Sequence, residues 1–114
     1  MDIELLHIVK RFDQKHVIND FSAMGALRAA KEMGCQVPRD VSIAGFGDVP
    51  FSSMTDPPLT TIREPFQKMG HEAAEMLFKI IHGKRLSEKH RVLPVELVIR
   101  ESTAPPLKRR NKDR

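Results

Sequence analysis

The residues that decide the fold are FSAMGALRAAKEMGCQVPRDVSIAGF, positions 21–46. Small and apolar residues recur in the first half of this stretch at helical spacing. They are Ala23, Met24, Ala26, Leu27 and Ala30. Asn19 or Asp20 can cap the start of a helix there, and Gly34 can end it in a left-handed conformation. The pattern therefore predicts a helix over 21–33.

The rest of the chain predicts short strands and one strongly amphipathic helix. The β-branched run 41–46 is bounded by turn residues and is typical of a buried strand, and 59–62 is also strand-like. A helix is predicted over 65–82, because a proline suits its first turn and its apolar residues form one stripe. That stripe consists of Phe66, Met69, Ala73, Met76, Leu77, Ile80 and Ile81. Residues 91–100 alternate between apolar and polar and contain a proline, which predicts a strand near a sheet edge. This order of elements is typical of an α/β layer architecture.

The charge of the chain is concentrated at its C-terminal end. The formal net charge is +4, but the segment 108–114 carries five basic residues and one acidic residue, and the remainder carries 14 of each. We therefore expect a neutral body with a basic, disordered tail. The chain has no Trp or Tyr, which argues against stacking on single-stranded nucleic acid.

Cysteine content and hydropathy limit the compartment and the class of protein. A length of 114 residues fits one domain at most. One cysteine, Cys35, excludes an internal disulfide. No run free of charged residues is long enough to span a membrane, and the N-terminus does not resemble a signal peptide. We expect a soluble, cytoplasmic protein.

No set of residues predicts catalysis or a metal site. Gly45-Phe46-Gly47 resembles the start of a dinucleotide-binding loop, but Pro50 occupies the third glycine position and no helix is predicted to begin there. The histidines do not have the spacing of zinc ligands. Ser52, Ser53 and Cys35 lack the strained elbow or neighbouring base that activates a nucleophile. We expect neither enzyme activity nor a cofactor.

Three residues leave a structural and a functional interpretation open. Asn19 and Asp20 can cap a helix, or they can face a ligand at the end of a strand, where open α/β sheets bind solutes. Phe66 can belong to the core or form a platform for a ligand.

Several motifs occur in an order that is specific to one family. Asn19-Asp20 precede Met24-Gly25-Ala26, and the segments VPRDVSIAGF, DPPLTTI, MGHEAAEML and LPVELVIREST follow. Over about residues 17–106 the chain resembles the C-terminal part of the lactose-repressor/galactose-repressor (LacI/GalR) family of bacterial transcriptional regulators. The resemblance implies an α/β fold, namely part of a type I periplasmic-binding-protein-like sensor domain with a mostly parallel sheet flanked by helices. In that family a small molecule, usually a sugar or nucleobase compound, binds between two lobes and changes their relative orientation.

The resemblance also assigns roles to single residues. Asn19 matches the family's effector-contacting asparagine, and Phe66 matches a position that packs against the effector. The family usually has Gly-Tyr/Phe-Asp-Asp where this chain has Gly45-Phe46-Gly47-Asp48, so Gly47 replaces an aspartate that typically binds effector hydroxyls. The candidate effector-binding residues are Asn19, Asp20, Gly47, Asp48 and Phe66.

The same resemblance indicates which partners to expect. Candidate dimer-interface residues, matched to surfaces used for dimerisation, are Met24, Phe51, Met54 and Thr55. A homodimer or a pairing with a related regulator is expected. Operator DNA would be bound only through a helix-turn-helix head that does not precede the match in this chain. No membrane partner is expected.

Most of the two-lobed sensor has no counterpart in the sequence. Residues 17–106 are the expected C-terminal portion of the effector domain, 1–16 an uncertain lead-in, and 107–114 the basic tail. The stripe on the helix 65–82 would then lack its natural sheet partner. A truncated or frameshifted regulator gene is one interpretation, and a free-standing small-molecule-binding or dimerisation module is the other.

Overall fold

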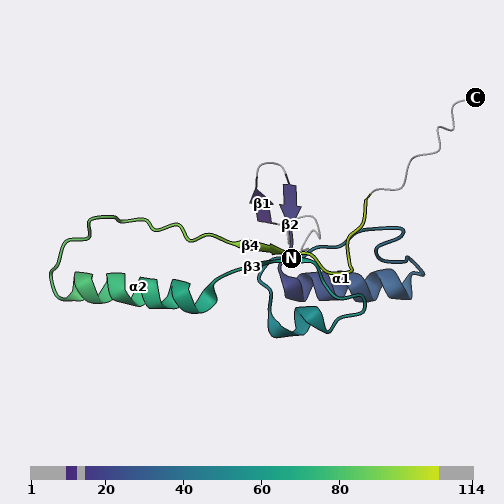
Figure 1. Ribbon diagram of the computed structural model, residues 1–114, viewed down its shortest axis with the longest axis horizontal. Coiled ribbons are helices and arrows are strands. Elements are labelled where there is room, and N and C mark those ends of the chain that lie inside the picture. Colours follow the sequence, from purple (N-terminus) through teal and green to yellow (C-terminus); the bar gives the residue numbers. More distant parts are fainter. Residues whose placement is uncertain (1–9, 13–14, 106–114) are drawn as a thin grey trace, which may run out of the picture. The chain divides into compact units, whose positions relative to one another are not determined.

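The computed structural model describes residues 10–12 and 15–105 (Figure 1). The predicted disordered tail, 107–114, lies outside these residues. Within the uncertain lead-in, β1 (Lys10–Phe12) and β2 (Lys15–Val17) pair antiparallel, with Lys10 opposite Val17. From there the chain divides into two compact units. The first unit runs to Arg63 and resumes at Leu97, and the second is Glu64–Glu96.

Helix α1 (Asp20–Glu32) organises the first unit and confirms the predicted helix to within one residue at each end. Its inner side buries Ala23, Leu27 and Ala30, three of the residues at helical spacing in the sequence. Leu59 completes the core against this side and is fully buried. Partly buried apolar side chains surround that cluster: Ile18, Val37 and Ile43. The core therefore consists of α1 packed on irregular segments.

The strand predicted over 41–46 is wrong as a regular element. Within it Ala44 forms one isolated parallel bridge, with Thr60, and Gly47, just beyond its end, forms another with Arg63. The amide of Gly45 donates to the carbonyl of Thr60 at 2.9 Å, and the amide of Gly47 donates to Ile62 at 2.7 Å. Gly47, the next residue after this segment, has a φ of 134°, outside the extended region, so a strand cannot continue past Phe46.

Short strands and a 3₁₀-helix complete the first unit. The element η2 (Pro50–Ser53) is a 3₁₀-helix, and β3 is Thr61–Arg63. The strand expected over 91–100 is reduced to β4 (Glu96–Val98), which pairs with β3. Among the described residues, the expected mostly parallel sheet is represented by two two-stranded sheets and the two parallel bridges.

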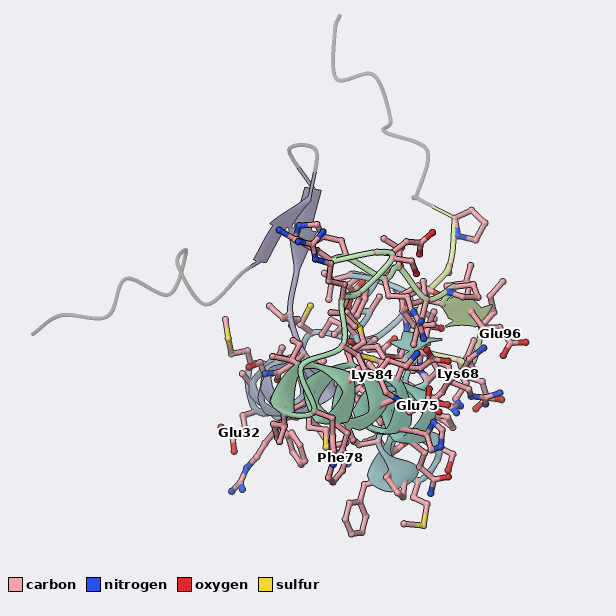
Figure 2. All side chains as sticks on the ribbon, turned by 90° about the vertical axis from the view of Figure 1, so that its left-hand side faces the viewer. Glu32, Lys68, Glu75, Phe78, Lys84 and Glu96 are labelled. Carbon is pink, nitrogen blue, oxygen red and sulfur yellow. The ribbon has the colours of Figure 1, made fainter. Side chains whose placement is uncertain are left out.

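The second unit contains α2 (Phe66–Ile81), which confirms the predicted helix to within a residue. None of its residues is buried, and Leu77 and Ile80 on the apolar stripe are each 57% exposed. Figure 2 shows Lys68 and Glu75 on one side of α2 and Phe78 on another. The apolar stripe of α2 is therefore exposed, as expected from the sequence. Among the described residues, no helix combines the length and the apolar character that a membrane crossing needs.

Candidate functional site

Asp20, the first residue of α1, is 1% exposed and joins three segments of the first unit. Its Oδ2 atom accepts hydrogen bonds from the Val49 amide at 3.0 Å and the Ser52 hydroxyl at 2.5 Å. Its Oδ1 atom accepts from the hydroxyl of Thr61 at 2.5 Å. A buried carboxylate is stable only with such donors. They tie α1 to η2 and β3.

Gly45 allows this arrangement because its backbone passes directly beside Asp20. A Cβ atom built at Gly45 would lie 2.2 Å from Asp20 Oδ1 and 3.0 Å from Leu59 Cδ2. Real Cβ atoms do not approach this closely, so a side chain at position 45 would require Asp20 to move. Gly45 is thus needed for close packing.

Asn19 is the N-cap of α1, which confirms the structural interpretation of this residue. Its Oδ1 atom accepts a hydrogen bond from the amide of Ser22 at 2.9 Å, and its carbonyl accepts from the amide of Ala23. The side chain lies at the surface. Its contact with an effector stays a prediction.

Gly47 and Asp48 follow the segment that packs against the start of α1. The carbonyl of Phe46 accepts a hydrogen bond from the amide of Asp20 at 3.2 Å, which places this segment beside the N-cap. Asp48 itself has a φ of 55°, so two successive residues adopt positive φ. Gly47 is buried, and its φ of 134° favours glycine over any residue with a Cβ. The missing aspartate therefore coincides with a backbone that disfavours one.

The carboxylate of Asp48 is held between two arginines. It accepts from Arg63 Nε at 2.7 Å through Oδ2 and from Arg100 Nη2 at 2.7 Å through Oδ1. Burial raises the pKa of the Asp48 carboxyl, but the hydrogen bonds and charges of both arginines outweigh it and hold the pKa below its ordinary value of 3.8. Asp48 is ionised at neutral pH and already paired.

Arg100 and Ser102 hold the segments around this site together, and the sequence did not identify either of them. Arg100 also donates to the carbonyl of Leu59 at 2.9 Å. Ser102 is fully buried, donates to the carbonyl of Ile43 at 2.6 Å and accepts from the amide of Thr60 at 2.8 Å. These contacts join positions about 40 to 60 residues apart in sequence, and no local pattern signals such pairs.

The candidate dimer residues occur on α1 and the η2 region. Phe51 and Met54 are 60% and 68% exposed, and Met24 is half-buried. The hydroxyl of Thr55 donates to carbonyls of its own loop, at 3.2 Å to Ser52 and 2.9 Å to Pro57. A hollow of about 220 Å³ is lined by Met24, Leu27, Arg28, Lys31, Thr55 and Asp56. Two of the four candidates, Met24 and Thr55, therefore line one hollow.

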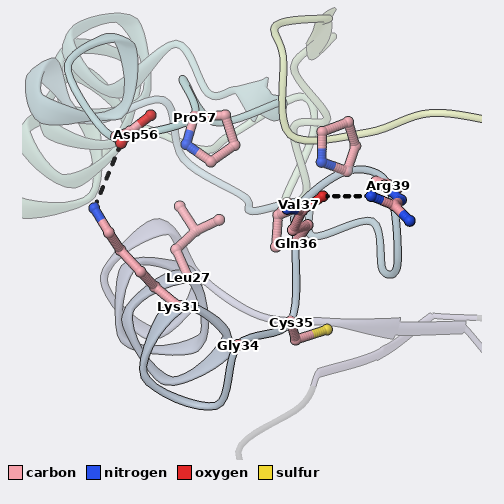
Figure 3. A pocket seen from close by; sticks show the side chains of 10 residues that line it. Leu27, Lys31, Gly34, Cys35, Gln36, Val37, Arg39, Asp56 and Pro57 are labelled. Carbon is pink, nitrogen blue, oxygen red and sulfur yellow. Dashed lines mark hydrogen bonds and ion pairs between the residues drawn. The ribbon is translucent and has the colours of Figure 1, made fainter.

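A second hollow, of about 490 Å³, lies at the C-terminal end of α1 (Figure 3). Lys31 Nζ lies 3.6 Å from Asp56 Oδ2 at its edge, and Arg39 Nη1 donates to Gln36 Oε1 at 3.2 Å. Cys35 also lines it, half-buried. The lining contains no histidine that could act as a base for this thiol.

Phe66, the remaining candidate, begins α2 in the second unit and is 52% exposed. A hollow of about 300 Å³ within this unit is lined by apolar residues of α2 and of the segment that follows it, together with the ion pair of Glu72 and Arg91. Phe66 does not line that hollow.

Comparison with known proteins gives consistent matches over most of the chain. A family model described as a periplasmic binding protein-like domain matches residues 16–103. The HTH-type transcriptional regulator MalR of Streptomyces coelicolor is 46% identical over 86 residues, which cover 75% of this chain and 25% of the relative. The chain thus spans about a quarter of the length of the curated relatives that it matches.

Solved structures give the same result. The lac repressor dimer bound to operator and the anti-inducer ONPF is 38% identical, with a TM-score of 0.70 over 76% of this chain and 30% of that one. A periplasmic binding protein/LacI transcriptional regulator from Alkaliphilus metalliredigens, complexed with D-xylulofuranose, is 33% identical, with a TM-score of 0.70 over 76% of this chain and 33% of that one.

Proposed function

Because this chain belongs to the family of periplasmic binding protein-like domains, we propose that it is the C-terminal portion of the effector-sensing part of a LacI/GalR-type transcriptional regulator. Its relatives are transcriptional regulators, and one of the similar structures holds a sugar. The whole regulator would act in the cytoplasm and bind operator DNA through a separate head. This chain contributes solute contacts and a self-association surface.

The observation that carries the proposal is the bond between Asp20, the residue after Asn19, and the segment 46–48. The backbone bond from Asp20 to Phe46 brings the N-cap and Gly47-Asp48 to adjoining positions, although they are far apart in the sequence. An amide side chain and a positive-φ loop at the start of a helix form a polar edge suited to sugar hydroxyls. We place Asn19, Gly47 and Asp48 at this edge, and Phe66 of the second unit stays a separate candidate for solute contact. Asp20 supports the edge from inside, since its carboxylate is already occupied by three donors.

An Asn19→Asp variant tests the solute site. Aspartate caps a helix as well as asparagine does, so α1 keeps its stability, but the amide donor is lost. Calorimetric titration of the whole chain with neutral mono- and disaccharides should show saturable binding for at least one sugar. One neutral hydrogen bond corresponds to about 1 kcal/mol, so the variant should bind that sugar roughly fivefold more weakly. Equal affinity in both proteins, or no binding of any sugar, would count against a solute site here.

A second candidate function is a module that pairs with a related regulator. The exposed apolar side chains of Phe51 and Met54 beside α1 favour it. Sedimentation of the purified chain, alone and mixed with a related full-length regulator, distinguishes self-association from pairing with a related regulator. A dimer of this chain supports self-association, whereas a complex that forms only in the mixture supports the module.

A further inference from the structure

The chain passes between its two compact units at two places. The first connection is the peptide bond after Arg63, where β3 ends, and the second is the bond after Glu96, the first residue of β4. The strands β3 and β4 are hydrogen-bonded neighbours. How firmly the second unit is attached therefore depends on how firmly the first unit holds these two strands.

The carboxylate of Asp48 binds a residue at the end of each strand. Its Oδ2 atom accepts from Nε of Arg63, the last residue of β3, and its Oδ1 atom accepts from Nη2 of Arg100, just beyond β4, each at 2.7 Å. The other terminal nitrogen of Arg100 donates to the carbonyl of Leu59, just before β3. One carboxylate thus joins the two strands close to both connections.

Asp48 is itself fixed in the first unit. The amide of Gly47 donates to the carbonyl of Ile62 at 2.7 Å, and the amide of Val49 donates to the buried carboxylate of Asp20 at 3.0 Å. The φ of Asp48 is 55°, a left-handed conformation that persists in a residue with a Cβ atom where the surroundings hold it. The two arginines are therefore bound to a position that cannot move without disturbing the interior of the first unit.

The environment of this carboxylate makes its bonds stronger than those of a surface ion pair. The side chain of Asp48 is 9% exposed, and that of Arg100 is 17% exposed. Hydrogen bonds between charged groups are stronger than neutral ones and are little screened in such a place. Ion pairs elsewhere in the first unit join exposed side chains of α1 and of neighbouring loops, and pairs of that kind contribute little.

We propose that Asp48 is a positioning residue for the attachment of the second unit. Its carboxylate braces β3 and β4 against each other and against the first unit, and it thereby limits how far the two connections move. This role needs neither a solute nor a partner, so it goes beyond the sensing and self-association proposed above.

Limited proteolysis of the whole chain reports the two connections separately. Trypsin cleaves the bond after Arg63, and glutamyl endopeptidase cleaves the bond after Glu96. Trypsin also cleaves after Arg28, inside α1, once the first unit unfolds. Because cleavage tracks the population of the open form, the wild-type protein should be cut faster at both connections than after Arg28.

Asp48→Asn preserves the size of the side chain and removes its charge. Initial cleavage rates at both connections, measured by mass spectrometry, should rise about tenfold, equivalent to about 1.4 kcal/mol, since a hydrogen bond to a charged group contributes at least that much. Cleavage after Arg28 should stay slower than at either connection. Asp56→Asn is the matched control, because Asp56 is 90% exposed and lies 3.6 Å from Lys31 of α1; both rates should keep their wild-type values.

Unchanged rates at the connections in Asp48→Asn would overturn the brace. Acceleration after Arg63 alone would also overturn it, because it would report only the release of that side chain. If circular dichroism shows that Asp48→Asn does not fold, Arg100→Lys decides, since lysine keeps the charge but cannot reach Leu59 and Asp48 with two nitrogens. Cleavage after Glu96 should then rise several-fold, and a wild-type rate would refute the role of Asp48. Neither readout requires a sugar or a dimer, so the results are independent of the proposed sensing function.

Discussion

Replacing Gly45 by alanine should destabilise the first unit by displacing Asp20. The new Cβ atom would stand 2.2 Å from Asp20 Oδ1, 3.0 Å from Leu59 Cδ2 and 3.2 Å from Asp20 Cα. Asp20 cannot rotate aside freely, because its two oxygens are held at 2.5, 2.5 and 3.0 Å by donors from η2 and β3. The methyl group must therefore break at least one of these bonds or push the backbone of α1 away.

The expected loss of unfolding free energy follows from these two routes, a broken hydrogen bond or a displaced backbone. Breaking one bond to the buried carboxylate costs about 1.5–3 kcal/mol, and overpacking by a methyl group costs about 1–3 kcal/mol. Because relaxation takes the cheaper combination, we expect the free energy of unfolding to fall by about 2–4 kcal/mol, a large share of the roughly 5–15 kcal/mol available to a small domain.

Urea denaturation followed by far-ultraviolet circular dichroism measures this loss, since the chain has no Trp or Tyr to report by fluorescence. Gly25→Ala is the matched control: it lies inside α1, and apart from the neighbouring backbone of the helix itself no atom stands within 4 Å of the place its methyl group would take. This change should stabilise the chain by about 0.5–1 kcal/mol through helix propensity. A Gly45→Ala protein within about 0.5 kcal/mol of the wild type would refute the packing argument.

Three further changes have defined outcomes. Asn19→Ala removes the cap of Ser22 and should lower the free energy of unfolding by about 1 kcal/mol, whereas Asn19→Asp should not; paired urea curves decide this. Asp48 has a folded pKa below 3.8, so its stabilising pairing is complete above that pH and is lost as pH falls through the folded pKa. The stability difference between wild type and Asp48→Asn, measured by denaturation, should therefore be largest near neutral pH and shrink below about pH 4; a constant difference would contradict the pairing. Leu77→Glu, on the exposed face of α2, should change the free energy of unfolding by less than about 0.5 kcal/mol and reduce binding of a hydrophobic dye; a larger loss would show that this face is covered.

The helices could be predicted from the sequence because their information is local. Spacing, capping residues and glycine stops placed α1 and α2 to within a residue at each end. The cap itself was one of two open interpretations of Asn19, and the bond to Ser22 confirmed it. Local rules are sufficient where an element is stabilised by its own neighbours.

The strand predicted over 41–46 failed for a physical reason. A β-branched start and turn residues are present, but a strand also needs continuous partners on its sides. Here the segment meets the chain near β3 at one bridge, Ala44 with Thr60, and the next residue after the segment, Gly47, leaves the extended region. The composition of the segment could not show how few strand pairings the neighbouring segment would make with it.

The polar interior was the least predictable part. Asp20 was expected to cap a helix or meet a solute, yet its three partners lie 29 to 41 residues away. Arg100 reaches Asp48 across 52 residues and was not a candidate at all. Each partner is an ordinary valine, serine, threonine or arginine in its local context, so only the folded chain identifies it.

Gly45 and Gly47 follow no simple sequence pattern, and each is explained by a nearby aspartate. Gly45 leaves the space that the Asp20 carboxylate occupies, and Gly47 permits the turn that presents Asp48 to its two arginines. An aspartate at position 47 would have to adopt a φ near 134°, at a cost of about 1–3 kcal/mol. Gly47→Asp should therefore lower the free energy of unfolding by that strain, whereas sugar binding should strengthen only if the new carboxylate reaches the solute. Tighter binding in calorimetric titration, together with lower stability, would establish that Gly47 gives up a solute contact in favour of this backbone geometry. Tighter binding at undiminished stability would show that the loop is not constrained in this way.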